Sequence, residues 1–251
     1  DKGLYPIDTF SFFDTAYYVT LGQLPIRDFW IISGLLIDYI QAFFFLIFGF
    51  SWRSYVMHSS FFNMGIALFF FYFLNNFSKF YFSNFLLSCC VAALCYPLIG
   101  TPFSYQHSFI LSFISILLFY LALQKNDQKY WFFLPFFMLA SFLCMQLPSG
   151  LINAFILIFL IIYFFQERKI SVYFFLGCFL CTLIVFIYFV FTKTNLKDFL
   201  VQYIYFPLSF GGERIAGSNS SFESARLLNN FNFKNIILHF KFINLFLLGN
   251  I

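Results

Sequence analysis

Charged side chains are scarce in this sequence. Lysine, arginine, aspartate and glutamate occupy 10% of its 251 positions, whereas hydrophobic residues occupy 62%. An ordinary soluble domain has about 25% charged residues. A soluble fold cannot hide this much apolar surface, so lipid must cover it. The sequence therefore predicts an all-α, polytopic integral membrane protein.

The sequence also lacks the short motifs of several enzyme classes. It has no GxGxxG, Walker loop, HExxH or GxSxG, so nucleotide-dependent and hydrolase functions have no support. The net charge of +4 is spread over short loops, which argues against nucleic acid as a partner. Cys178 and Cys181 have no second ligand pair, so helix packing explains them better than zinc. We expect no cofactor, with a divalent metal ion as the open alternative.

Long apolar runs fill most of the chain. Each is near the roughly 20 residues that a spanning helix needs, and together they cover residues 32–50, 54–74, 82–99, 105–124, 131–147, 149–166 and 171–192. Residues 193–235 predict a long polar loop, and a further helix begins near residue 236. No repeat or linker divides the chain, which predicts a single membrane domain. Because both ends look cut, we expect further segments before and after it.

Basic residues predict the orientation of these helices. They recur in every second short loop, at Lys79, Lys125, Lys129, Arg168 and Lys169. Loops rich in lysine and arginine stay in the cytoplasm. The loops 100–107, 146–150 and 193–235 then lie on the outer side, which we expect to be the periplasmic side of a bacterial inner membrane.

The run 32–50 decides on which side the N-terminal residues lie. Asp38 and Gln41 lie in its middle, and a central aspartate costs a spanning helix about 2.5–3.5 kcal/mol. We therefore predict a partly buried helix that does not span. Residues 1–53 then form an outer loop with interfacial helices, and six spans cover 54–192. If the run did span, residues 1–31 would be cytoplasmic.

Three carboxylates and an arginine gather in the stretch from Asp8 to Asp28, beside an otherwise apolar chain. Apolar residues near helical spacing over 8–22 predict an amphipathic helix in the membrane interface, with Asp8 as its N-cap. Gly22 and Pro25 lie beyond its end. Asp14 lies six residues after Asp8 and is predicted to be solvated on another face.

This stretch resembles the first extracytoplasmic loop of the GT-C membrane glycosyltransferases. It is most similar to the dolichyl-phosphate-mannose-protein mannosyltransferase and RgtA/B/C/D-like branch. That loop has Asp, Ala eight residues on, Gly six further on, and then Pro-Tyr-Arg-Asp. The matching residues here are Asp8, Ala16, Gly22 and Pro25-Ile26-Arg27-Asp28, with Ile26 in place of tyrosine. Two later segments, Gly34-Leu35-Leu36 and Phe48-Gly49-Phe50-Ser51, also resemble family motifs, the first without its proline.

The resemblance implies transfer of a hexose or pentose from a polyprenyl-phosphate donor to a glycan, lipid or protein hydroxyl. Asp8 aligns with the family's catalytic aspartate, which would act as general base; helix capping is its competing role. Arg27 is a candidate ligand of the donor phosphate, since a guanidinium suits a bidentate oxyanion contact. Asp28 would pair with Arg27 as a clasp or orient the donor.

Three further residues are candidate substrate contacts. Tyr105 and His107 lie at the next outer loop, where His107 would contact phosphate or cap the helix that starts there. Arg214, in the second large outer loop, would hold the donor phosphate or remain solvated. We expect His107 and Arg214 to converge with Asp8 and Asp28 on one outer cavity.

Two other classes of function compete with this one. The first is a polysaccharide polymerase or ligase, or a flippase of lipid-linked sugars. The second is a solute transporter, which needs charged side chains along a path through the membrane. After Asp38 the apolar runs contain almost no charged residue, which argues against transport.

Overall fold

The computed structural model describes residues 6–31, 34–97, 100–167 and 171–207. The chain divides into two compact units, Asp1–Tyr203 and Ile204–Ile251. All the helices described below, α1 to α9, belong to the first unit. The predictions for Arg214, for residues 208–235 and for the helix near residue 236 lie outside the described residues.

The described part of the chain is helical and contains no β-strand, which confirms the predicted all-α fold. Its elements are α1 (Pro6–Thr20), α2 (Leu35–Phe48), α3 (Trp52–Asn75), α4 (Tyr81–Cys95), α5 (Ser104–Lys125), α6 (Gln128–Cys144), α7 (Ser149–Glu167), α8 (Val172–Thr192), α9 (Leu196–Leu200) and a π-helical turn, η1 (Val201–Tyr205).

Four of these helices, α3, α5, α7 and α8, are long and apolar enough to cross a membrane. The chain therefore has the character of a multi-pass membrane protein. Helices α4 and α6 are shorter, with 15 and 17 residues, so the predicted count of six spans stays a prediction. Within the four long helices, the most apolar window is 67% buried in α5 and at most 22% buried in the others. Helix α5 is thus the core of the bundle, and the other three expose apolar surface that suits lipid.

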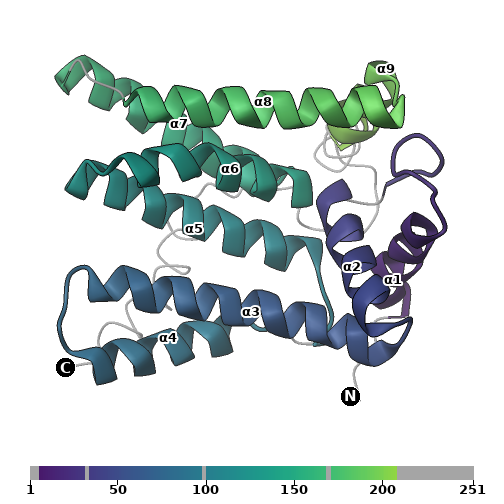
Figure 1. The fold of residues 1–251 in the computed structure, drawn as a ribbon, viewed down its shortest axis with the longest axis horizontal. Helices are drawn as coiled ribbons and strands as arrows, with labels where there is room; N and C mark the ends of the chain where they lie inside the picture. The colour runs from purple at the N-terminus through teal and green to yellow at the C-terminus, as the bar shows by residue number, and fades with distance from the viewer. Residues whose placement is uncertain (1–5, 32–33, 98–99, 168–170, 208–251) are drawn as a thin grey trace, which may run out of the picture. The chain divides into compact units, whose positions relative to one another are not determined.

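Helices α3 to α8 run alternately in opposite directions (Figure 1). The connections from α3 to α4 and from α5 to α6 lie at one end of the bundle and carry Lys79, Lys125 and Lys129. At the opposite end α5 and α7 begin and α8 finishes (Figure 1). This opposite end also holds basic residues, namely Arg27, Arg53 and Lys193. We call it the α1–α2 end.

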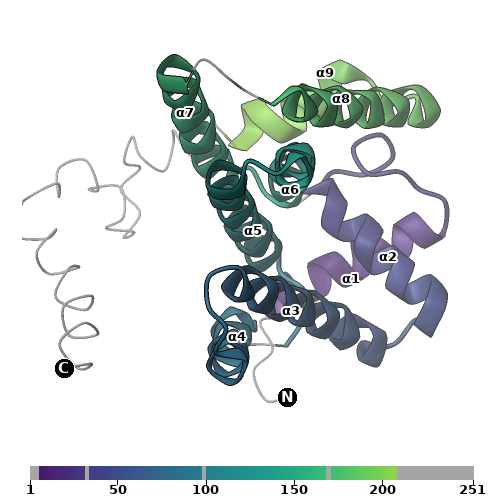
Figure 2. The same ribbon diagram turned by 60° about the vertical axis from the view of Figure 1, so that its left-hand side comes forward.

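Helices α1 and α2 pack against each other at the α1–α2 end (Figures 1 and 2). The Phe10 ring lies 5.8 Å from the Trp52 ring at the start of α3. The Phe12 ring lies 6.2 Å from the Phe103 ring, just before α5. The polar stretch therefore lies beside the starts of α3 and α5, which is the relative placement that the lysine and arginine pattern predicts.

Helix α2 is too short to span a membrane. Its 14 residues extend about 21 Å, less than the roughly 30 Å of a hydrocarbon core. Gly34 precedes it and approaches the carbonyl oxygens of Leu143 and Cys144 so closely that a Cβ atom would overlap them. The start of α2 is thus packed tightly against the end of α6. That α2 does not span the membrane stays a prediction.

Two predicted boundaries are wrong. Helix α1 begins at Pro6, so Asp8 lies in its first turn and is not its N-cap; proline suits a first helical position because it lacks an N–H. The predicted loop 193–235 begins with a helix instead. The side chain of Asn195 accepts a hydrogen bond from the Lys197 N–H (2.9 Å) and so starts α9 within this segment.

Candidate functional site

Three polar side chains of α2 connect it to three different helices. Asp38 Oδ1 lies 2.6 Å from Thr15 Oγ1 of α1, and the hydroxyls of Tyr39 and Tyr188 of α8 lie 3.4 Å apart. Gln41 Oε1 lies 2.8 Å from Nδ1 of His58 in α3. Successive residues of an α-helix are rotated by about 100°, so these three side chains point in different directions. Asp38 and Gln41, the two residues that argue against a membrane-spanning helix, therefore connect α2 to its neighbours.

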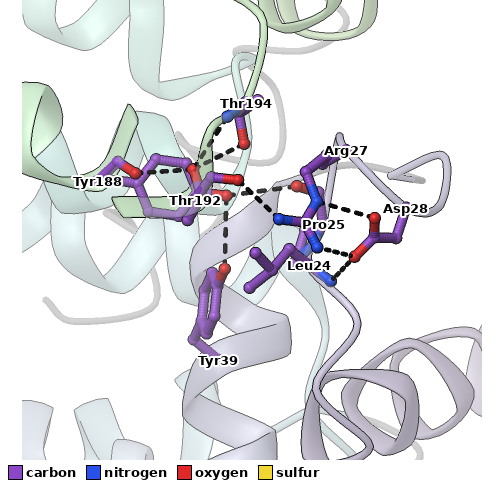
Figure 3. Close-up of polar contacts among 8 residues, drawn as sticks. All are labelled: Leu24, Pro25, Arg27, Asp28, Tyr39, Tyr188, Thr192 and Thr194. Atoms are coloured by element: carbon purple, nitrogen blue, oxygen red, sulfur yellow. Dashed lines mark hydrogen bonds and ion pairs between the residues drawn. The ribbon is translucent and has the colours of Figure 1, made fainter. Parts of the chain in front are cut away.

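Arg27 and Asp28 form a bidentate ion pair at the end of a loop that follows α1 (Figure 3). Arg27 Nε and Nη2 each donate to one carboxylate oxygen of Asp28, both at 2.8 Å. The Leu24 N–H also donates to Asp28 Oδ2, at 2.8 Å. The hydrogen bonds from Arg27 and Leu24 hold the pKa of the Asp28 carboxyl below its usual value. Asp28 is thus the predicted clasp partner of Arg27.

Arg27 also contacts the end of α8. Its Nη1 donates to the Thr192 carbonyl at 2.9 Å, where the negative end of the helix dipole favours a cation. The Tyr188 hydroxyl donates to the Pro25 carbonyl at 3.3 Å, so α8 holds the loop at two points (Figure 3). These contacts use three of the five N–H groups of the guanidinium, which leaves two for a ligand. The Arg27 side chain is 40% exposed, so a ligand can reach it.

A strained residue precedes Arg27. Ile26 has a φ of 75°, which is a genuine outlier for a β-branched residue and costs of order 1–3 kcal/mol. Gln202 holds this conformation, because its Nε2 donates to the Ile26 carbonyl (3.0 Å) and its Oε1 accepts from the Ile31 N–H (3.2 Å). The side chain of Ile26 is buried beside Tyr203. The loop therefore turns Ile26 into the protein and Arg27 towards the surface.

His107, which the sequence placed at an outer loop where a helix starts, lies inside the protein. It belongs to the first turn of α5 and is fully buried. Its Nδ1 lies 2.8 Å from the Phe103 carbonyl, and its Nε2 lies 2.9 Å from Nε2 of His58. Both ring nitrogens are therefore engaged within the fold. His58 is also buried, and both of its ring nitrogens lie within hydrogen-bond distance of a partner.

Counting protons defines the state of this histidine pair. A carbonyl only accepts, so His107 carries its proton on Nδ1 and presents a lone pair at Nε2. His58 must then donate from Nε2, which leaves its Nδ1 as an acceptor in the neutral ring. Gln41 can donate to that nitrogen only if its side-chain amide is rotated by 180°, so that Nε2 faces His58 in place of Oε1. The rotation also gives a partner to Gln41 Nε2, which is buried and otherwise has none. The result is a neutral chain of hydrogen bonds from Gln41 through both imidazoles to the Phe103 carbonyl.

Of the predicted site residues, the structure brings Arg27 and Asp28 together. Asp8 lies on α1 at the same end of the bundle, but its side chain lies outside what the structure describes. Tyr105 is 59% exposed at the start of α5. The predicted convergence of Asp8, Asp28, His107 and Arg214 is therefore not tested.

A cavity of about 360 Å³ lies beside His58. Its lining is otherwise apolar, namely Phe44, Phe61, Phe62, Gly65, Ile66, Phe69, Ile110, Leu111, Ile114 and Phe137. Of the predicted site residues that the structure describes, none lines it.

Four residues of the site escape sequence reasoning: Tyr39, Tyr188, Thr192 and Gln202. Tyr188 and Thr192 lie in an apolar run among many similar residues, and Thr192 contributes a backbone carbonyl that no side-chain pattern reports. Gln202 carries a weak signal, since it is a lone amide between apolar residues.

No family model, curated protein or solved structure matches this chain. The resemblance to the GT-C glycosyltransferases therefore rests on the motifs between Asp8 and Ser51.

The histidine pair makes a testable prediction about stability. Replacing either His58 or His107 by Leu should lower the free energy of unfolding by about 1–3 kcal/mol, because it leaves a buried nitrogen without a partner. The double variant should lose less than the sum, with a coupling of about 0.5–3 kcal/mol. Unfolding in detergent micelles measures the cycle, with Tyr105→Phe as an exposed control. Strict additivity would show that the two rings do not interact.

Proposed function

We propose that this protein is a membrane glycosyltransferase of the periplasmic face of a bacterial inner membrane. It transfers a hexose or pentose from a polyprenyl-phosphate donor to a hydroxyl group of a glycan, lipid or protein. Asp8 acts as the general base, and Arg27 binds the donor phosphate. The Arg27 site carries the proposal, because it offers a fixed guanidinium with two unused N–H donors in the loop that follows the helix that bears Asp8.

The chemistry of sugar transfer suits this arrangement. As the glycosidic bond to phosphate breaks, negative charge develops on the phosphate oxygens, and a pre-positioned cation stabilises it. Asp28 and Thr192 hold the Arg27 guanidinium before a donor arrives, so little reorganisation is needed. The acceptor hydroxyl must lose a proton in the same step, which a carboxylate such as Asp8 can take.

The distribution of charge favours an enzyme over a transporter. Within the described parts of α3 to α8, the charged residues lie near the helix ends, at Arg53, Lys125, Lys129 and Glu167. A transporter needs such groups along its path. A polymerase, a ligase and a flippase would share a lipid-phosphate ligand with the proposed transferase. A flippase forms no glycosidic bond, so sugar transfer that depends on Asp8 would exclude it.

The proposal makes a direct prediction for Asp8. In proteoliposomes supplied with polyprenyl-phosphate hexoses and pentoses and with membrane-extracted acceptors, Asp8→Asn should reduce sugar transfer at least 100-fold, since a general base contributes about 10²–10⁴-fold. Asp14→Asn, on the exposed face of the same helix, is the matched control and should retain activity. Full activity in Asp8→Asn would rule out this assignment.

A second prediction separates phosphate binding by Arg27 from a purely structural ion pair. Arg27→Gln should weaken binding of a polyprenyl monophosphate in nanodiscs about 10- to 100-fold, as expected for hydrogen bonds to a charged group worth about 1.5–3 kcal/mol. Asp28→Asn should weaken binding less than Arg27→Gln does, because it loosens the guanidinium but leaves its charge, its contact with Thr192 and more free N–H donors for the phosphate. If both variants lose binding equally, Arg27 serves the loop and not the ligand.

A further inference from the structure

Asp38 is a buried carboxyl group between α1 and α2. Its residue is 2% exposed, and its contact Thr15 is 7% exposed. The Oδ1–Oγ1 distance of 2.6 Å is at the short end for hydrogen bonds between oxygen atoms. Burial of a carboxyl group in α2 is costly unless the group is neutral or paired with a cation.

The hydroxyl of Thr15 has two hydrogen-bond contacts. It lies 3.0 Å from the Ser11 carbonyl of the preceding helical turn and 2.6 Å from Asp38 Oδ1. The hydroxyl has one proton, and a carbonyl and a carboxylate both only accept. While Asp38 is charged, the two acceptors must share the single hydroxyl proton of Thr15; once Asp38 is a neutral carboxylic acid, it can donate to Thr15 while Thr15 donates to Ser11, so that each contact has its own proton.

The surroundings of Asp38 also disfavour its charged form. No lysine or arginine in the described part of the chain interacts with it. The titratable groups that it influences from α2, α3, α6, α8 and η1 are neutral phenols and a thiol, namely Tyr39, Tyr55, Tyr188, Tyr203 and Cys144. On α1, among the residues from Phe10 onward whose side chains the structure describes, the titratable residues Asp14, Tyr17 and Tyr18 are exposed. Burial therefore raises the pKa of the Asp38 carboxyl to about 7, although donation by Thr15 to the charged carboxylate lowers it in part.

We propose that Asp38 is a proton-binding site that fastens α1 to α2. The protonated carboxyl donates to Thr15, and loss of the proton leaves a buried carboxylate without a cation, which releases α1. This inference goes beyond the proposed transferase activity and does not depend on it. Because α1 carries Asp8, the site would make the position of that residue sensitive to pH.

The direction of the pH effect follows from the raised pKa. A carboxyl whose pKa is higher in the folded protein than in a free chain gives its stabilising contact at low pH and loses it as pH rises. Contact between α1 and α2 should therefore be complete below about pH 6 and weaken through the pKa near 7.

Infrared spectroscopy of the protein in lipid vesicles tests the protonation state directly. At pH 6 the wild type should show the carbonyl stretching band of a protonated carboxylic acid, and this band should decline around pH 7. Asp38→Asn should remove the band, and Asp14→Asn should leave it in place. Absence of the band at pH 6, or its persistence in Asp38→Asn, would overturn the proposal.

Hydrogen exchange of the α1 amides tests the release, after correction for the intrinsic effect of pH. Wild-type protection should fall at least tenfold between pH 6 and pH 8. Asp38→Asn should stay protected at both values, because its amide N–H donates to Thr15 as the neutral acid does. Thr15→Val should expose α1 at both. If the protection of wild-type α1 does not change with pH, then protonation of Asp38 does not control the contact between α1 and α2.

Discussion

The fold depends on the need to pair the polar side chains of a short, buried helix. Helix α2 carries a carboxyl, a phenol and an amide among apolar residues, and an unpaired buried group costs about 1–3 kcal/mol. Each finds its partner on a different helix: Thr15 on α1, Tyr188 on α8 and His58 on α3. These directional contacts hold α2 in one orientation. Apolar packing between helices is less directional and would specify that orientation less strictly.

This arrangement explains how a polar stretch stays in place beside an apolar bundle. Helix α1 is attached through Asp38, and the loop after it is attached to the end of α8 through Arg27 and Pro25. Gln202 braces the same loop from a segment far along the chain. The strained φ of Ile26 is sustained by these contacts, and strain of this kind occurs at functional sites. This constrained loop thus presents the Arg27 guanidinium at the protein surface.

The sequence predicted the helical class, the short α2 and the placement of the polar stretch relative to the loops. Those features follow from composition, from Asp38 and Gln41 within an apolar run, and from lysines in alternate loops. It did not predict the burial of His107, because its neighbours in sequence resemble a loop end and its partner His58 lies on another helix. It also missed Thr192 and Tyr188, whose roles arise from a tertiary contact. The contact of Arg27 with the Thr192 carbonyl involves the backbone, which every residue has, so the sequence pattern cannot predict it.

The central claim is that the polar stretch and the start of α5 share one side of the membrane, opposite the basic loops. Single cysteines at Leu21 and Tyr105, both 59% exposed, and at Lys79 and Lys125 can be labelled in intact cells with a membrane-impermeant maleimide and compared with the parent protein. Labelling at positions 21 and 105, with labelling at 79 and 125 only after permeabilisation, is the predicted result. Labelling of positions 21 and 105 from opposite sides would contradict the account.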